Sequence, residues 1–277
     1  MQYEKVLLDH GSGGRASRWL VEQVIVPRLH NSILDRLNDH ATIEPAGSRL
    51  AFTTDSYVVD PIFFPGGDIG RLAVNGTVND LAMGGSQPLY LSAGLIIEEG
   101  FSIADLTQIV ESMAAAARDA GVQIVTGDTK VVPRGKADKL FINTSGVGRI
   151  LGDSRVDAAS AAVGDVVLLS GPIGEHGIAI LSGRPGLDLK SPCVSDTAPL
   201  AKMVGSMLDV CPEIHCLRDP TRGGLAATLD ELSRQSGVRM EIDESSIEVS
   251  EAVAAACEIL GFDPMHLANE GVLVCIA

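Results

Sequence analysis

Three aspartates in this chain stand where apolar segments meet small or polar residues: Asp55 in Thr-Asp-Ser, Asp80 in Asn-Asp-Leu and Asp128 in Gly-Asp-Thr. A carboxylate in an apolar setting is costly unless it is paired or bound to a metal ion. If the three converge, they form a Mg²⁺ site for the phosphates of a nucleotide, because that ion prefers hard oxygen ligands. Three separate caps or turns, a common use of aspartate, explain the same residues.

The stretch from Val125 to Val132 adds a glycine and an ammonium group to one of these carboxylates. Gly127 allows the backbone to approach a ligand closely, Asp128 offers an oxygen and Lys130 a positive charge. Together they suit an anionic, metal-bound substrate. Gly-Asp is also an ordinary turn dipeptide, whereas the apolar residues on both sides favour a strand edge.

A second anion-binding candidate is the glycine loop at residues 11–14, which precedes a helix expected from about Ala16. Backbone N–H groups at the start of a helix bind phosphates. The loop is not a Walker motif, and it matches the dinucleotide pattern G-x-G-x-x-A only loosely, through Gly11, Gly13 and Ala16. A flexible N-terminal turn is the alternative.

In the second half, Arg218–Leu225 places charges and glycines directly before an expected helix. Asp219 there belongs either to an anion or metal site at a helix N-terminus or to an ordinary cap. Cys211 and Cys216, with His215 between them, match no zinc spacing, and no second pair completes a site. We interpret these cysteines as structural.

Strands and amphipathic helices must position these residues. We expect strands at 50–59, 88–98, 122–126, 139–150, 166–170 and 270–277, and helices at 103–120, 196–209, 222–236 and 250–260. The helix at 103–120 has the clearest signals, with Ser102 as its N-cap and Gly121 at its end. Residues 61–67, Pro-Ile-Phe-Phe-Pro-Gly-Gly, indicate a rigid turn with exposed aromatic side chains.

The segment 151–164 is small, polar and rich in alanine, and we interpret it as the linker between two domains, residues 1–155 and 156–277. Both halves mix helices and strands, so an α+β fold is expected for each. The chain has 277 residues, 45% of them apolar, which is enough to bury a sizeable core.

Charge and cysteine content exclude several classes of protein. A net charge of −15 argues against binding nucleic acid or an anionic membrane surface. The five cysteines, an odd number in the last third of the chain, do not read as a disulfide framework and favour a reducing compartment. The sequence shows no signal peptide and no apolar run of about 18 residues, so we expect a cytoplasmic protein.

Taken together, these motifs resemble the aminoimidazole ribonucleotide synthetase-like (PurM-like) superfamily of ATP enzymes and, within it, the HypE family of hydrogenase maturation factors. The resemblance runs almost from end to end. It is carried by His10–Gly14, Thr54–Pro61, Phe63–Gly67, Asn75–Asp80, Val125–Val132, Gly174–Gly177, Arg218–Leu225 and Ala268–Gly271.

This resemblance implies a two-domain, mixed α/β and α+β fold in which the N-terminal domains of two subunits join their sheets into a β-barrel, so a homodimer is expected. It also implies ATP and Mg²⁺ between the domains. The implied cofactor-binding residues are Gly11, Ser12, Gly13, Gly14, Asp55, Asn79, Asp80, Thr126, Gly127, Asp128 and Asp219, with Asp55, Asp80 and Asp128 at the metal. The expected catalytic residues are Lys130, which stabilises the phosphorylated oxygen, and Glu270, which accepts a proton.

The activity that the resemblance implies is the ATP-dependent dehydration of a carbamoyl group on the protein's own C-terminal cysteine to a thiocyanate. In that family HypF loads the carbamoyl group, and the cyanide passes to iron on a HypC–HypD scaffold for the [NiFe] hydrogenase centre. The family ends in Pro-Arg-Ile-Cys, whereas this sequence ends at Ala277 in an apolar run. We therefore expect a missing tail, without which full turnover fails.

Other functions fit parts of the same pattern. Another PurM-like enzyme, such as a purine-type or selenophosphate synthetase or a thiamin-phosphate kinase, would keep the fold and change the substrate. A non-catalytic dimeric scaffold would have no use for Asp55, Asp80, Asp128 and Lys130. A nucleotide-dependent oxidoreductase would use residues 11–16 instead.

Overall fold

The computed structural model describes residues 14–20, 22–23, 34–39, 41–43, 49–184, 186–187 and 191–277. Three of the glycine-loop residues, Gly11, Ser12 and Gly13, lie outside these ranges, as does the position of His10. Gly14 begins helix α1 (Gly14–Leu20), which agrees with the helix expected from about Ala16.

A five-stranded sheet forms the centre of the N-terminal half. Its strand order is β1 (Ala41–Ile43), β2 (Leu50–Tyr57), β7 (Leu140–Ile150), β5 (Ser86–Glu98) and β6 (Gln123–Val132). Neighbouring strands are antiparallel except β5 and β6, which are parallel. Helix α4 (Ile103–Ala120) makes the crossover that a parallel pair requires.

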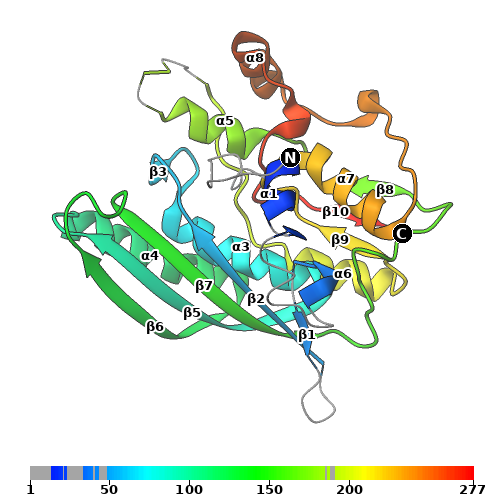
Figure 1. Cartoon of the computed structure of the whole chain (residues 1–277), viewed down its shortest axis with the longest axis horizontal. Helices are drawn as coiled ribbons and strands as arrows, with labels where there is room; N and C mark the ends of the chain where they lie inside the picture. Colours follow the sequence, from blue (N-terminus) through cyan, green and yellow to red (C-terminus); the bar gives the residue numbers. More distant parts are fainter. Residues whose placement is uncertain are drawn as a thin grey trace.

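The sheet is covered on one face only. Figure 1 shows α3 (Ile69–Met83) and α4 together behind the four long strands. The core between them contains Val78 of α3, Ile109 of α4 and Leu91 of β5, all fully or almost fully buried. The opposite face carries Phe52, Tyr90 and Ile96 with 42–49% of each residue exposed, so it is open in the single chain.

A smaller antiparallel sheet organises the C-terminal half, in the order β8 (Val167–Leu169), β10 (Val274–Ile276) and β9 (Cys216–Arg218). Helices α6 (Ala201–Val210) and α7 (Gly224–Ser236) pack against this sheet, and α5 (Glu175–Ser182) and α8 (Glu251–Leu260) pack against each other. Short 3₁₀ turns lie at Leu34–Arg36, Glu244–Ser246 and Pro264–His266. No helix in the described ranges is long and apolar enough to cross a membrane.

The segment at residues 61–67 belongs to the N-terminal half and contacts the C-terminal half. The prediction of a turn with exposed aromatic side chains is wrong. The segment forms the hairpin of β3 (Phe63–Phe64) and β4 (Gly67–Asp68), and Phe64 is only 7% exposed. The Ser195 N–H donates to the carbonyl oxygen of Pro65 at 2.8 Å. Gly66, with φ of +91°, lies so close to Ser195 that a Cβ would meet its backbone nitrogen at 2.8 Å, so the close approach requires glycine.

The long elements agree with the sequence, and several boundaries do not. Helix α4 begins after the Ser102 cap and ends at Gly121, whose φ is +75°. Strand β6 continues beyond the expected end at 126 to Val132, which confirms the strand edge favoured for Val125–Val132 and excludes the alternative of a turn at Gly127-Asp128. Helix α6 begins at Ala201 rather than 196. The interval 151–164, which we interpret as a linker, contains no helix or strand.

Candidate active site

A cavity of about 740 Å³ lies between the N-terminal and C-terminal halves. Strand β2 and helix α3 form one wall, and helix α5 with the segments around residues 219–222 and 268–270 forms the other. Five of its lining side chains are carboxylates: Asp39, Asp55, Asp80, Asp219 and Glu270. The cavity therefore gathers acidic groups from parts of the chain far apart in sequence.

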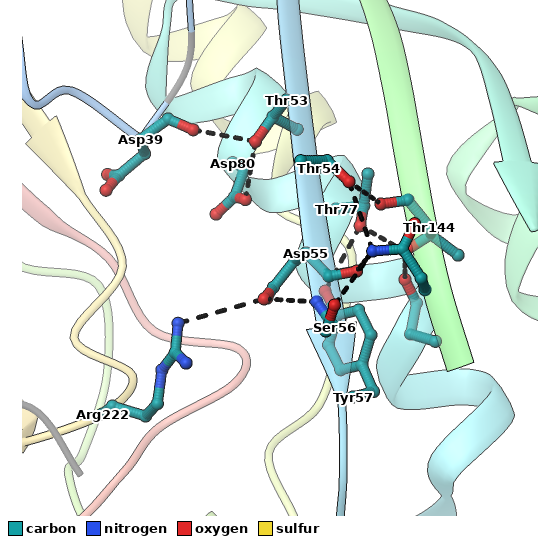
Figure 2. A network of polar contacts seen from close by, with 12 residues as sticks. Asp39, Thr53, Thr54, Asp55, Ser56, Tyr57, Thr77, Asp80, Thr144 and Arg222 are labelled. Carbon is teal, nitrogen blue, oxygen red and sulfur yellow. Dashed lines mark hydrogen bonds and ion pairs between the residues drawn. The ribbon is translucent and has the colours of Figure 1, made fainter. Parts of the chain in front are cut away.

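Successive side chains of β2 point to opposite faces of the sheet, and every second one lies on the side of this cavity. Thr53, Asp55 and Tyr57 point to the helix-covered side, while the residues between them face the open side of the sheet. The Thr53 hydroxyl lies 3.1 Å from Asp80 Oδ2 and 2.9 Å from the carbonyl oxygen of Asp39. Figure 2 shows the Asp39, Asp80 and Asp55 carboxylates on the same side of β2.

Positive charge near these carboxylates is limited. The Asp55 carboxylate accepts from the Ser56 N–H at 2.7 Å, and Arg222 Nη2 lies 3.9 Å from Asp55 Oδ1. Arg222 is mostly exposed, so this pair is a weak one. The buried Arg218 donates to Asp39 at 2.7 Å and to Glu231 at 3.1 Å, so among the five carboxylates it is bonded to Asp39 alone.

Burial and mutual repulsion make these carboxylates bind protons unusually well. Burial, with added repulsion from Asp219 and Asp39, raises the pKa of Asp80 well above its ordinary value. Burial and the neighbouring Asp39 raise the pKa of Asp219 to about 7. Burial also raises the pKa of Glu270 well above its ordinary range, and Asp219 and Asp196 add to that effect. A cation in the cavity would relieve this repulsion.

The donor set fits a magnesium ion that binds together with phosphates. Asp219 Oδ2 is buried and makes no hydrogen bond within the described residues. No three acidic, histidine or cysteine side chains in that part of the chain stand close enough to form a ready-made metal cluster. Mg²⁺ ordinarily takes one or two carboxylates and completes its shell with water and substrate phosphates, so this arrangement suits a nucleotide-borne ion.

A chain of hydroxyl groups holds Tyr57 at the cavity wall. Thr144 donates to the carbonyl oxygen of Ala73 at 2.9 Å, so Thr77, 2.5 Å away, must donate to Thr144. Tyr57 then donates to Thr77 at 3.3 Å. Gly76 lies directly beneath the tyrosine hydroxyl, where any side chain would collide with it. Gly76 of α3 therefore makes room for Tyr57, whose side chain lies beside Thr77 of the same helix (Figure 2).

Both halves of the molecule hold the backbone of Glu270. Asn79 Nδ2 donates to the carbonyl oxygens of Ala198 at 3.0 Å and Glu270 at 3.3 Å, while Asn79 Oδ1 accepts from the Leu200 N–H at 2.8 Å. The carboxylate of Asp196 accepts from the Glu270 N–H, which lies 3.0 and 3.1 Å from its two oxygens, and from the Gly271 N–H at 3.1 Å. Asn79 thus positions the backbone at residues 198, 200 and 270, and its side chain does not line the cavity.

The carboxylate expected at residue 128 does not join the other two within one chain. Asp55 pairs in register with Thr144, Thr144 with Ala93, and Ala93 with Gly127. Paired residues share a face, so Asp128, next to Gly127, faces the open side of the sheet. It also lies three strands away from Asp55, about 14 Å at the usual strand spacing.

The neighbours of Asp128 share its exposed edge position. Lys130 Nζ lies 3.1 Å from Asp128 Oδ2, and both side chains are about two-thirds exposed. The Lys130 ammonium and the Thr129 N–H lower the pKa of Asp128. Thr126 and Gly127 lie on the same exposed strand. The strand order that separates β6 from β2 is a long-range property, which local spacing in the sequence does not reveal.

Sequence reasoning missed three residues of the cavity region. Asp39 stands in an irregular polar segment, where Asn38-Asp39 resembles any turn. Asp196 lies in a stretch expected to be helical, and its contact with Glu270 spans 74 positions. His176 lies within Gly174–Gly177, one of the segments that carry the resemblance, but its local sequence does not show that it lines the cavity, where it is 5% exposed.

Two family models match the chain. One, described as AIR synthase related protein, N-terminal domain, covers residues 37–150, and the other, described as AIR synthase related protein, C-terminal domain, covers residues 162–277. The chain is also 56% identical over 271 residues to a protein of Azotobacter vinelandii named carbamoyl dehydratase HypE. The matched residues make up 98% of this chain and 80% of that protein.

Two solved structures resemble the fold closely. A HypE–HypF complex contains a chain with a TM-score of 0.89 and 48% identity, over 93% of this chain and 84% of that one. A HypE structure in complex with ATP gives a TM-score of 0.81 and 52% identity, over 98% of this chain and 81% of that one. The mixed two-part architecture is therefore that of the AIR synthase-related proteins.

Proposed function

Because the chain belongs to the HypE family of carbamoyl dehydratases within the AIR synthase-related superfamily, we propose that it uses ATP to convert a carbamoyl group into a cyano group for [NiFe] hydrogenase. The carbamoyl group is carried on a cysteine thiol, the C-terminal cysteine of the family, and HypF supplies it. A structure named as a HypE–HypF complex supports HypF as the partner. The HypC–HypD complex as cyanide acceptor and a cytoplasmic location belong to the same proposal.

The reaction removes the elements of water from an S-bound carbamoyl group. The carbonyl oxygen takes the γ-phosphoryl group of ATP, and ADP leaves. The nitrogen then loses both protons as the C–O bond breaks, so phosphate departs with the oxygen and a C≡N bond remains. Because the phosphorylated oxygen is a far better leaving group than oxide or hydroxide, this route makes the dehydration accessible.

We assign the carboxylates of the cavity to two tasks. Asp55, Asp80 and Asp219 bind Mg²⁺ and the phosphates, which the unpartnered oxygen of Asp219 and the raised pKa of Asp80 support. Bound Mg²⁺ offsets the negative charge of the phosphates and of these side chains. Glu270 accepts a proton from the nitrogen, since its raised pKa makes it a better base than an ordinary carboxylate.

The remaining residues expected at the metal or in catalysis, Asp128 and Lys130, act from the partner subunit of a homodimer in this proposal. Strand β6 is an edge strand with nine of its ten residues exposed. The open sheet face is lined with apolar side chains such as Phe52 and Ile96, which is typical of a surface that another protein covers. A two-fold pairing of two such sheets, as in the family's barrel, would carry Asp128 and Lys130 of one subunit towards the cavity of the other.

The observation that supports the proposal most is the convergence of five carboxylates on one cavity with little neutralising charge. The test is calorimetric titration of the protein with ATP, with and without Mg²⁺, and with NAD. We expect Mg²⁺-dependent ATP binding that Asp55→Asn and Asp80→Asn each weaken at least tenfold, because each removes a ligand or charge partner. Binding of NAD without binding of ATP would show the proposal to be wrong.

A further inference from the structure

The backbone around Glu270 is bonded on both sides of its Cα. Its N–H and that of Gly271 both donate to the carboxylate of Asp196, at 3.0–3.1 Å. Its carbonyl oxygen accepts from Asn79 Nδ2 and from the Ala198 N–H, both at 3.3 Å. The side chain is the part of the residue that lines the cavity. Residues 79, 196 and 198 therefore set the direction in which the Glu270 side chain leaves the backbone.

Two successive N–H groups that donate to one side chain call for a carboxylate. An ionised carboxylate accepts hydrogen bonds at both of its oxygens and donates none. An asparagine at position 196 would turn its NH₂ group towards one of the two N–H groups. Gly271 belongs to the same contact, because a Cβ there would collide with the carbonyl oxygen of Asp196.

The charge of Asp196 has no cation to pair with among the described residues. The side chain is mostly buried. Burial raises its pKa, and the nearby Glu175 carboxylate adds to that effect. Because a buried charge without a cation costs stability, an acidic residue here points to a use beyond holding the fold. The same charge, after burial and Asp219, raises the pKa of Glu270, which makes Glu270 a better proton acceptor.

We propose that Asp196 is a positioning residue for the dehydration: through the N–H groups of residues 270 and 271 it holds the Glu270 carboxylate where it accepts a proton from the carbamoyl nitrogen. This inference rests on the proposed function and adds a residue that does not itself line the cavity. A change at Asp196 should therefore slow the chemical step through Glu270 and leave the binding of Mg²⁺-ATP as it is.

The assay supplies the substrate as a short peptide that ends in an S-carbamoylated cysteine, with heavy oxygen in the carbamoyl group. Dehydration passes this oxygen to the released phosphate, whereas simple hydrolysis of ATP does not, so labelled phosphate reports the proposed reaction alone. Calorimetry measures the binding of Mg²⁺-ATP separately. Asp263→Asn is the matched control, because the exposed Asp263 also accepts from a backbone N–H, that of Met265 at 2.9 Å, in the same half of the molecule.

We expect Asp196→Asn to lower kcat by about 10- to 100-fold, because a small displacement of a catalytic group is costly. Its dissociation constant for Mg²⁺-ATP should stay within about threefold of that of the original protein. Asp196→Ser, which is smaller and keeps a single acceptor oxygen, should show the same selective loss. The control should change kcat by less than about twofold, as expected for an exposed side chain.

A double variant shows whether Asp196 acts through Glu270. We expect Glu270→Ala to lower kcat by about 100-fold or more, and adding Asp196→Asn to it should lower kcat no further. Losses that multiply in the double variant, or substitutions of Asp196 that weaken Mg²⁺-ATP binding as much as they lower kcat, show a merely structural role and overturn the inference. Failure of the original protein to bind Mg²⁺-ATP or to release labelled phosphate overturns the proposed function, and this role with it.

Discussion

At the scale of single residues, Asp219 is a carboxylate that suits ligand binding, although its burial lowers the free energy of unfolding near neutral pH. The side chain is 6% exposed, and one of its oxygens has no hydrogen-bond partner in the described part of the chain. Its pKa is raised to about 7 by burial and by Asp39, against about 3.9 in an unfolded chain. The folded protein therefore holds more protons than the unfolded one between these values, and the free energy of unfolding falls as pH rises from about 4 to about 7.

Replacing Asp219 by asparagine should remove this pH dependence. We expect Asp219→Asn without nucleotide to be more stable than the original protein at pH 8, by on the order of 1–3 kcal/mol. Near pH 4 the two should be similar, because the aspartate is then protonated. Thermal unfolding at a series of pH values measures this, with the exposed Asp153→Asn as the control for loss of one charge. Parallel stability profiles for Asp219→Asn and the original protein would contradict the argument.

The functional residues that the sequence reveals are those whose local setting is unusual. Asp55 and Asp80 each interrupt an apolar stretch, and the structure brings both to the same cavity. Asp128 has the same local signature but lies on the far strand and the opposite face. Asp196 has no such signature, because its role depends on a contact with the distant Glu270 backbone. The local sequence identifies charged residues that do not belong in an apolar core, but it does not show which distant residues they contact in the fold.

At the scale of elements, helix α3 connects the sheet to the C-terminal half. Its residues are buried along almost the entire length, including the polar Asn75, Thr77 and Asn79. Asn79 alone bonds the backbone at residues 198, 200 and 270. This explains why the pattern at 69–84 shows only partial helical periodicity: the polar positions face protein as well, so the usual exposed stripe is missing.

Removing the Asn79 amide should separate these segments. We expect Asn79→Ala to lower the free energy of unfolding by about 2–4 kcal/mol, because the carbonyl oxygen of Ala198 and the N–H of Leu200 lose their partner, and the carbonyl oxygen of Glu270 keeps only the Ala198 N–H. Gln108→Ala, on the exposed face of α4, should change it by less than about 0.5 kcal/mol. Chemical denaturation of both variants measures the difference, and equal, small effects would show that Asn79 does not join the halves.

Element length and capping account for what could be predicted of the fold. Helix α4 has eighteen residues, a serine cap and a terminal glycine, and its bounds were predicted without error. Helix α5 has eight residues and begins in a glycine-rich motif with no side-chain cap, and β9 has three residues. Neither is long enough to show a period, so both were missed. The division of the chain at 155 and 156 remains a prediction.

At the scale of the whole molecule, the open sheet face is the feature that the single chain does not explain. Apolar side chains on this face are solvent-exposed, and strand β6 leaves its outer edge unpaired within the described residues. Edges of this kind invite pairing with another chain. In the homodimer we propose, that pairing also places Asp128 and Lys130 beside the partner's cavity, so assembly and nucleotide binding depend on each other.

Mixing two defective variants tests this dependence directly. Asp55→Asn damages a site in its own subunit, and Asp128→Ala damages the site of the partner if it acts across the dimer. In a mixed dimer one site then carries both changes and the other carries neither, so random mixing should restore Mg²⁺-ATP binding at roughly a quarter of all sites. If Asp128 served its own subunit, each site in the mixed dimer would keep one defect and nothing would be restored. Adding Ile96→Asp to both variants places a charge on the open face; it should yield monomers by analytical ultracentrifugation and abolish the restored binding, because a buried unpaired carboxylate opposes association.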